Sequence, residues 1–186
     1  MSDHDDFEAD YWGTCVNTFD EEQKHYVYAD LMELPRQHYS FVLPPVRVVD
    51  IGGGPVSMLL KCHRLISGLV VDPLEYAVWT QQRYRMHNID VLAMPGETFG
   101  RTGFDEAWIY NCLQHTQDPQ RIIQNALQAA PVLRLFEWID IPPHPGHPHE
   151  LTADNLRSWI GTTGGNVREY NSQGCYGRAF GGVFRR

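Results

Sequence analysis

The sequence predicts an α/β domain built on a doubly wound, mostly parallel sheet with helices on both faces. Apolar, β-branched runs alternate along the chain with segments whose apolar residues recur at helical spacing. Residues 46–55, VRVVDIGGGP, join one such run to a cluster of three glycines. The 186 residues suit one domain with one core. Alternating strands and helices of these lengths favour a single wound sheet over separate α and β blocks.

The chain divides into an acidic start, a helical cap and a core. Residues 1–10 are acidic and are expected to be flexible. Residues 11–44 are expected to form an N-terminal helical cap, because Thr18 and Glu21 fit a capping box ahead of apolar residues at helical spacing. This cap would cover a sheet edge or close over a ligand. Residues 45–186 form the core of the single domain.

The elements of the core follow in order. The first strand, at residues 46–50, is expected to lead through the glycines into a helix at residues 57–62. Further strands are expected at residues 69–71, 89–93, 104–110 and 132–138, with helix starts at Pro73, Asp118 and Thr152. Two antiparallel strands between residues 167 and 184 are expected to close the sheet.

Charge and cysteine content narrow the class of protein. The net charge of −8 disfavours a non-specific polyanion binder, because Lys and Arg supply affinity for phosphates. The four cysteines have no close pair, which disfavours disulfide frameworks and zinc fingers. The first residues lack the basic and apolar regions of a signal peptide, and no apolar run is long enough to span a bilayer. We therefore expect a cytoplasmic protein that does not associate with membranes.

The glycine cluster and a later acid indicate a nucleotide-type cofactor site. Glycines let a ligand approach the backbone, and a helix N-terminus after them favours a negative group. Asp72 ends the second strand roughly 20 residues on, where such sites place the acceptor for ribose hydroxyls. A cap of the helix after Pro73 is the structural alternative for Asp72. Asp50 either contacts the ligand, braces the turn, or is tied to loop N–H groups.

Taken together, these motifs resemble a class I S-adenosylmethionine-dependent methyltransferase of the small stand-alone type found in bacteria and their phages. The resemblance runs from about Tyr11 to Phe184 and rests on residues 50–55, Asp72, the loop at residues 93–97 and the segment 104–119. It implies a Rossmann-like sheet, S-adenosylmethionine as methyl donor, S-adenosylhomocysteine as product and a small-molecule acceptor. A phage-encoded protein would act in the host cytoplasm.

The resemblance also implies roles for individual residues. His115 lies just past the fourth strand, where substrate and methyl group meet in the family, and is the candidate general base. Its alternative is a loop histidine that bonds the backbone or caps the next helix. Tyr11 and Trp12 would surround the sulfonium with aromatic faces, or else belong to the core. The expected cofactor-binding residues are Tyr11, Trp12, Asp50, Gly52, Gly53, Gly54, Asp72, Pro73, Glu97 and Asn111.

Two departures from the family pattern stand out. Val56 occupies the place of the last glycine of the turn, which puts the backbone path there in question. The usual Pro-Gly-Gly before the fifth strand is missing at residues 129–132. Separately, His144, His147, His149 and Glu150 offer metal-ligand types. Prolines between them are expected to enforce an extended path that separates the side chains, so we expect no metal site and a loop that borders the acceptor pocket.

Two rival functions share the same motifs. An NAD(P)-dependent oxidoreductase has the same strand, glycine turn and ribose acid, but Ser57 stands where its fingerprint requires a third glycine. A non-catalytic cofactor-binding module would keep the cofactor residues and lack an acceptor pocket. A nucleic-acid acceptor is disfavoured by the charge and by residues 111–114, which lack the Pro-Pro-aromatic pattern of DNA amino-methylation. The acceptor's identity and the oligomeric state stay open.

Overall fold

The computed structural model of the chain describes residues 11–12, 15–172 and 174–186. The expectation that residues 1–10 are flexible lies outside these residues. The strands are β1 (Arg36–Gln37), β2 (Ser40–Ile51), β3 (Cys62–Asp72), β4 (Ile89–Ala93), β5 (Glu106–Tyr110), β6 (Val132–Ile139), β7 (Asn166–Ser172) and β8 (Cys175–Arg185). The α-helices are α2 (Cys15–Leu31), α3 (Val78–Met86), α4 (Pro119–Ala129) and α5 (Ala153–Ile160), and the 3₁₀ turns are η1 (Gly54–Val56), η2 (Met58–Lys61), η3 (Gly96–Thr98) and η4 (Leu113–His115).

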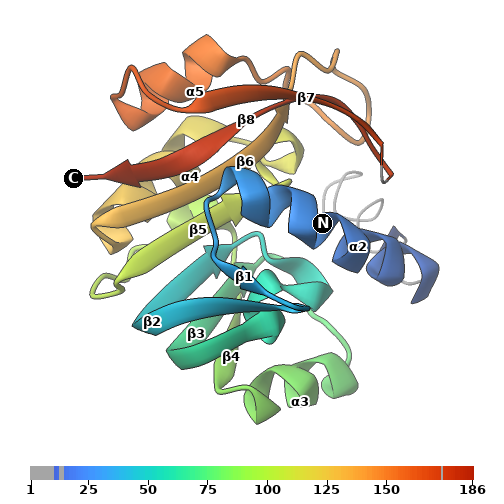
Figure 1. The fold of residues 1–186 in the computed structure, drawn as a ribbon, viewed down its shortest axis with the longest axis vertical. Helices are drawn as coiled ribbons and strands as arrows, with labels where there is room; N and C mark the ends of the chain where they lie inside the picture. The colour runs from blue at the N-terminus through green and yellow to red at the C-terminus, as the bar shows by residue number, and fades with distance from the viewer. Residues whose placement is uncertain (1–10, 13–14, 173) are drawn as a thin grey trace.

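The described strands form one eight-stranded sheet in the order β4-β3-β2-β5-β6-β8-β7, with β1 paired to β2 (Figure 1). Strands β4, β3, β2, β5 and β6 run parallel to one another. Strand β8 runs antiparallel to β6, and β7 runs antiparallel to β8. The predicted mostly parallel sheet with antiparallel C-terminal strands is therefore confirmed. The carboxyl ends of β2, β3, β4 and β5 meet at one edge of the sheet, where ligands bind in open α/β folds.

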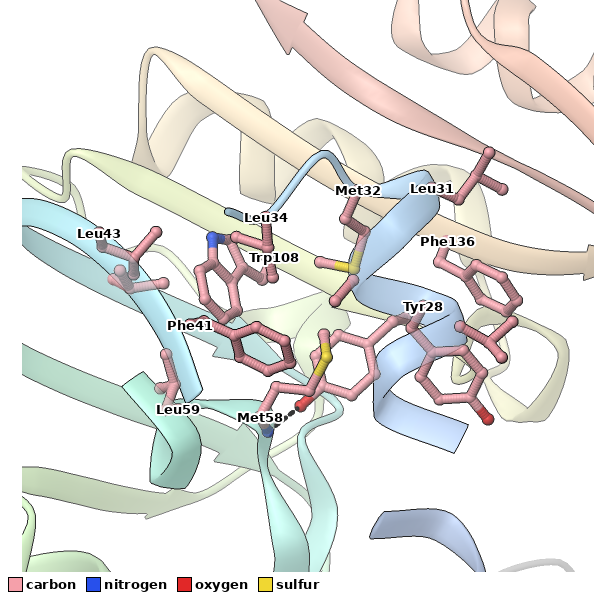
Figure 2. Close-up of a cluster of buried hydrophobic side chains, with 14 of the residues drawn as sticks. Tyr28, Leu31, Met32, Leu34, Phe41, Leu43, Met58, Leu59, Trp108 and Phe136 are labelled. Carbon is pink, nitrogen blue, oxygen red and sulfur yellow. Dashed lines mark hydrogen bonds between the residues drawn. The ribbon is translucent and has the colours of Figure 1, made fainter. Parts of the chain in front are cut away.

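Helices cover both faces of the sheet, as predicted. Helix α2 lies on one face, where Tyr28 and Met32 pack in the same buried cluster as Phe41 and Trp108 (Figure 2). Helices α4 and α5 cover the other face and belong to a second cluster. A fully buried side chain of this size contributes about 1.5–3 kcal/mol relative to an exposed one. The two apolar layers therefore supply the main stabilisation of the fold.

A buried ion pair joins α2 to the sheet. Arg134 of β6 donates to both carboxylate oxygens of Glu106 of β5, at 2.7 and 3.0 Å. Its guanidinium also donates to the carbonyls of Met32 and Glu33, just past the end of α2. The indole N–H of Trp108 donates to the same carboxylate at 2.8 Å. Both carboxylate oxygens of Glu106 and all three guanidinium nitrogens of Arg134 thus form hydrogen bonds, which help a buried ion pair to be tolerated.

The N-terminal cap is shorter than predicted. Helix α2 begins at Cys15, so Thr18 lies within the helix and forms no capping box with Glu21 at its start. The helix ends at Leu31, and β2 already begins at Ser40, inside the range expected to be helical. Phe41 and Leu43 are buried in the sheet, and this packing outweighs the local pattern.

The helix predicted for residues 57–62 does not form. Two 3₁₀ turns, η1 and η2, connect β2 to β3, and β3 begins at Cys62. Tyrosine hydroxyls bond the backbone of this connection: Ser57 N donates to Tyr84 Oη at 2.8 Å and Met58 N to Tyr110 Oη at 3.0 Å. Val56 is buried in the turn. Glycine is needed at this place to pack a helix tightly on the sheet, and without that helix a branched side chain fits.

The later elements follow the sequence more closely. Strand β4 forms where a strand and loop are expected, and it continues as a strand to Ala93. Asp118 caps α4 by accepting from Arg121 N at 2.9 Å, and Thr152 caps α5 by accepting from the N–H of residue 155 at 3.1 Å. Helix α3 begins at Val78 and not beside Pro73. No helix in the described part of the chain combines the length and apolar character that crossing a membrane requires.

Candidate functional site

A cleft of about 1600 Å³ lies at the carboxyl ends of the parallel strands. Ile51, Asp72, Ala93 and Asn111, at or just past the ends of β2, β3, β4 and β5, all line it. Helix α2 contributes to its wall through Glu21. The cleft brings together these residues predicted from the sequence: Tyr11, Trp12, Gly52, Gly54, Asp72, Pro73, Glu97, Asn111 and His115.

The glycine turn has the open backbone that a close-fitting ligand needs. Gly52 has φ +80°, and a Cβ there would lie 2.6 Å from the Cβ and Sγ of Cys112. Gly54 has φ +62°, and its missing Cβ would point toward Trp12 and Tyr76 at 3.8 and 4.0 Å. Only glycine adopts these left-handed conformations without strain. Gly54 is itself buried, and its missing Cβ leaves space beside Trp12 and Tyr76 where the turn lines the cleft.

Asp50 and Gly53 lie beneath the turn and do not line the cleft. Asp50 is fully buried and its Oδ2 accepts from Ser57 Oγ and Tyr110 Oη, each at 2.5 Å. Burial raises the pKa of the Asp50 carboxyl to about 7. A Cβ on Gly53 would lie 2.4 Å from Asp50 Oδ2, so glycine is required for the carboxylate to fit. Of the roles considered for Asp50, its contacts match bracing of the turn and not contact with a ligand.

Asp72 lies at the junction of the turn and the cleft. Its Oδ2 accepts from Gly54 N at 3.2 Å, and its Oδ1 accepts from Leu74 N at 3.0 Å and from Tyr76 Oη at 2.9 Å. Because α3 begins only at Val78, Asp72 is not an α-helix cap. The carboxylate is 7% exposed. It is therefore held rigidly, with its tyrosine neighbour, at the edge of the cleft.

Aromatic residues and Glu97 surround the same region. Tyr11 and Trp12 are half-buried and pack edge to face, with ring centroids 4.9 Å apart. Glu97 follows β4 and its Oε1 accepts from Gln117 N and Asp118 N at 3.0 and 3.2 Å. This carboxylate thus ties the loop after β4 to the start of α4, a structural contact that its position in the sequence does not reveal.

His115 ends η4, which follows β5, and lines the cleft. Its Nδ1 lies 2.8 Å from the carbonyl oxygen of Gly146. A carbonyl only accepts hydrogen bonds, so Nδ1 carries the proton and the neutral ring has its lone pair on Nε2. The backbone contact is the one expected of a loop histidine. In the neutral ring this tautomer leaves the lone pair of Nε2 available, as a general base needs.

The histidine-rich loop turns back on itself. His144 and His147 exchange backbone hydrogen bonds of 2.9 and 2.8 Å across Gly146. The predicted extended path is therefore wrong, because Gly146 permits a tight turn between prolines. The centroid of the His147 ring lies 4.5 Å from that of the His115 ring and 4.2 Å from that of the His144 ring. Among the described residues, no group of three or more His, Cys, Asp or Glu side chains could hold a metal ion. The loop lines the cleft through His144, His147 and His149.

Sequence reasoning missed several cleft residues contributed by distant elements. Lys24 of α2 is the only Lys or Arg among the described residues that line the cleft, and it pairs with Glu21 at 3.4 Å. Glu21, Asp72, Glu75 and Glu97 give the lining an acidic character. An acidic, partly aromatic wall favours a ligand that carries positive charge. Asp72 and Glu97 were predicted from the sequence, but no local pattern predicts Glu21, Lys24 and Glu75 as cleft residues, since they reach the cleft only in the folded chain.

No protein-family model matches this sequence, and no curated protein sequence does. Solved structures match its fold. The N-methyltransferase NodS from Bradyrhizobium japonicum, solved with S-adenosylhomocysteine, gives a TM-score of 0.63 at 16% identity over 88% of this chain and 87% of its own. Magnesium protoporphyrin IX methyltransferase from Synechocystis, solved with S-adenosylmethionine, gives 0.60 at 17% identity over 90% and 81%.

The cyclase SpnF gives a TM-score of 0.54 at 15% identity; the match covers 81% of this chain and only 59% of SpnF. The chain thus has the fold of class I S-adenosylmethionine-dependent methyltransferases, as the sequence predicts. Because SpnF is a cyclase by name, this fold alone does not define the reaction.

Proposed function

We propose that this protein transfers a methyl group from S-adenosylmethionine to a small-molecule acceptor. The observation that carries the proposal is that the glycine turn, Asp72 and His115 face one cleft at the carboxyl edge of a methyltransferase-type sheet. In this fold the cofactor and the reacting group of the substrate meet at that edge. We place the activity in the cytoplasm, as expected from the sequence.

The residues of the cleft fit the methyl donor. Gly54 lines the cleft without a side chain, so a ligand could approach the turn closely, and Asp72 offers carboxylate oxygens to ribose hydroxyls. The acidic lining and the faces of Tyr11 and Trp12 suit a sulfonium and an ammonium group. The helix N-terminus expected to favour the donor's carboxylate is absent, because η1 and η2 replace that helix. That part of the sequence-based expectation is therefore wrong.

The chemistry divides between the donor and the protein. When bound, S-adenosylmethionine supplies a methyl group already activated by the sulfonium. The protein's task is to align the acceptor with that methyl group, which accounts for much of the acceleration in such displacements. His115 Nε2 would take the proton from an acceptor O–H or N–H, while Gly146 holds the opposite nitrogen. Asn111, just past the end of β5, also lines the cleft.

Two observations bear on the alternatives. A dinucleotide's pyrophosphate binds at the N-terminus of a helix after the glycine turn. Here only 3₁₀ turns follow, so an NAD(P)-dependent reaction is less well supported than methyl transfer. The small number of cations around the cleft favours a small acceptor over nucleic acid. A non-catalytic module would bind the donor and show no turnover with any acceptor.

Calorimetry tests the proposal. S-adenosylmethionine and S-adenosylhomocysteine are expected to bind the purified chain and NAD is not. Asp72→Asn is expected to weaken S-adenosylhomocysteine binding by about 10-fold or more, because it removes a charge-assisted bond to the ribose. Exposed Asp90→Asn, at the edge strand β4, is the matched control. Binding of NAD alone, or unchanged affinity in a folded Asp72→Asn variant, would contradict the proposal.

A further inference from the structure

We propose that Glu21 of α2 is a positioning residue that sets the direction of a path of hydrogen bonds ending at His115. In this way Glu21 keeps His115 Nε2 unprotonated and able to take up a proton. The inference rests on the proposed role of His115 as a base in methyl transfer. Glu21 is 6% exposed and lies 90 residues from its partner Asn111 in the sequence. Its role is visible only in the folded chain.

The hydrogen-bond path from Glu21 to His115 has three steps. Asn111 Nδ2 donates to Glu21 Oε1 at 3.0 Å. Gln114 Nε2 donates to Asn111 Oδ1 at 3.3 Å and lies 3.4 Å from His115 Nε2. Asn111 has φ +50°, a left-handed conformation that brings its side chain toward α2. The contacts thus link α2, the end of β5 and η4 in one path.

Glu21 determines which way each amide in the path points. An ionised carboxylate only accepts hydrogen bonds, so Asn111 must turn its NH₂ group toward Glu21. Its carbonyl oxygen then faces Gln114, which must in turn present its own NH₂ group. The same NH₂ group faces His115 Nε2 across 3.4 Å, so in the chain without an acceptor molecule that nitrogen has to accept; an acceptor O–H or N–H would take the place of this contact. Each step removes one alternative orientation of the next residue.

Gly146 fixes His115 from the other side of the ring. Its carbonyl accepts from Nδ1 at 2.8 Å, which places the proton on Nδ1. Both ends of the path therefore demand the same tautomer, with Nδ1 protonated and Nε2 unprotonated. Protonation of Nε2 would set an N–H against the NH₂ group of Gln114, which disfavours the imidazolium.

Gln114 shows why Glu21 is needed. Gln114 is 3% exposed, and its Oε1 is buried with no hydrogen-bond partner in the described structure. The reversed amide would set Oε1 against Asn111 Oδ1, two acceptors facing one another, for as long as Glu21 holds Asn111. Once Glu21 no longer imposes a direction, both amides can reverse. Gln114 Oε1 would then accept from His115 Nε2–H and stabilise the protonated ring.

Other charged groups also face His115 and have to be held constant. Glu137 of β6 lies close enough to interact with it electrostatically, and His147 packs against its ring. Lys24 pairs with Glu21 on α2. Replacing Glu21 alone would leave Lys24 unpaired and change the field at His115. A double substitution, Glu21→Gln with Lys24→Met, removes both charges and leaves the net charge of the pair at zero.

The test is an NMR titration of His115 in the full-length chain without donor or acceptor. Relative to the wild-type protein, the double variant is expected to raise the titration midpoint of His115 by about one pH unit. Adding Gln114→Met to the double variant is expected to abolish the rise, because no carbonyl is left to turn toward Nε2. An unchanged midpoint in a folded double variant, or a rise that survives Gln114→Met, would overturn the proposal.

A second measurement needs no variant. The ¹⁵N shifts of neutral His115 in the wild-type protein are expected to show the proton on Nδ1, and a proton on Nε2 would overturn the proposal even if the double variant failed to fold. Neither experiment depends on methyl transfer. If S-adenosylmethionine did not bind, the proposed function would be wrong. The titration results would still test the effect of Glu21 on His115.

Discussion

Replacing Asp50 by Asn is expected to make the stability of the protein less dependent on pH. The Asp50 carboxyl lies beneath the glycine turn, accepts from Ser57 Oγ and Tyr110 Oη, and has no partner for its Oδ1 in the described structure. Burial raises its pKa from 3.8 to about 7, and the nearby Asp72 adds to the rise. Asn has the shape of the protonated carboxyl and carries no charge between pH 4 and pH 8.

The size of the effect follows from linkage. Between about pH 4 and pH 7 the unfolded chain has lost the Asp50 proton while the native chain retains it. The native pKa is raised, so this group's stabilisation is fully present below the unfolded pKa and is lost as the pH rises through the native pKa. A difference of roughly three pKa units corresponds to about 4 kcal/mol. As the pH rises from 4 to 7, the free energy of unfolding of the wild-type protein is therefore expected to fall by about 4 kcal/mol relative to that of the Asn variant.

Urea denaturation followed by tryptophan fluorescence from pH 4 to pH 8 measures this difference. Burial also raises the pKa of Glu137 to about 7, but that residue is present in both proteins and its contribution cancels. Asp90→Asn, at an exposed position of β4, controls for the chemical change alone. A stability difference between the Asp50→Asn and wild-type proteins that stays constant over this range would refute the assignment of Asp50 as a buried brace that binds a proton near neutral pH.

Two further predictions concern the ion pair and the base. Arg134→Met is expected to lower the free energy of unfolding, measured by urea denaturation, by about 3–5 kcal/mol, because Glu106 would stay buried without its partner. Adding Glu106→Leu is expected to recover most of this loss, and equal stability of the two variants would be inconsistent with the prediction. His115→Gln is expected to lower kcat by about 10²–10⁴-fold with an unchanged Kd for S-adenosylhomocysteine, measured with the first acceptor found by screening; full turnover would leave alignment as the mechanism.

Elements whose ends carry local chemistry could be predicted from the sequence. The caps Asp118 and Thr152 mark the starts of α4 and α5 as expected. In each case a side chain satisfies backbone groups within a few residues. The mostly parallel sheet with two closing antiparallel strands was also predicted from the alternation of strands and helices, whereas the strand order comes from the structure.

Elements decided by distant contacts were predicted wrongly. Residues 57–62 are apolar enough for a helix or a strand, and the hydroxyls of Tyr84 and Tyr110 select the 3₁₀ connection by bonding its backbone. Thr18 and Glu21 match a capping box, yet the helix already begins at Cys15. Glu21 faces the cleft instead.

The candidate site shows the same division. Gly54, Asp72 and His115 follow the ends of parallel strands, and the topology alone brings them to one edge. Asp50 ends the same type of strand but points beneath the turn, where Gly53 leaves room for it. The link from Glu21 to His115 depends on side-chain orientations that no sequence pattern records.

A crystal structure of the chain with S-adenosylhomocysteine tests the central claim most directly. The ribose hydroxyls are expected to donate to Asp72, the backbone at Gly54 to contact the ligand, and the sulfur to face the side of the cleft that holds His115. A ligand seated in the cleft with its ribose away from Asp72, or with its sulfur turned away from His115, would contradict the account.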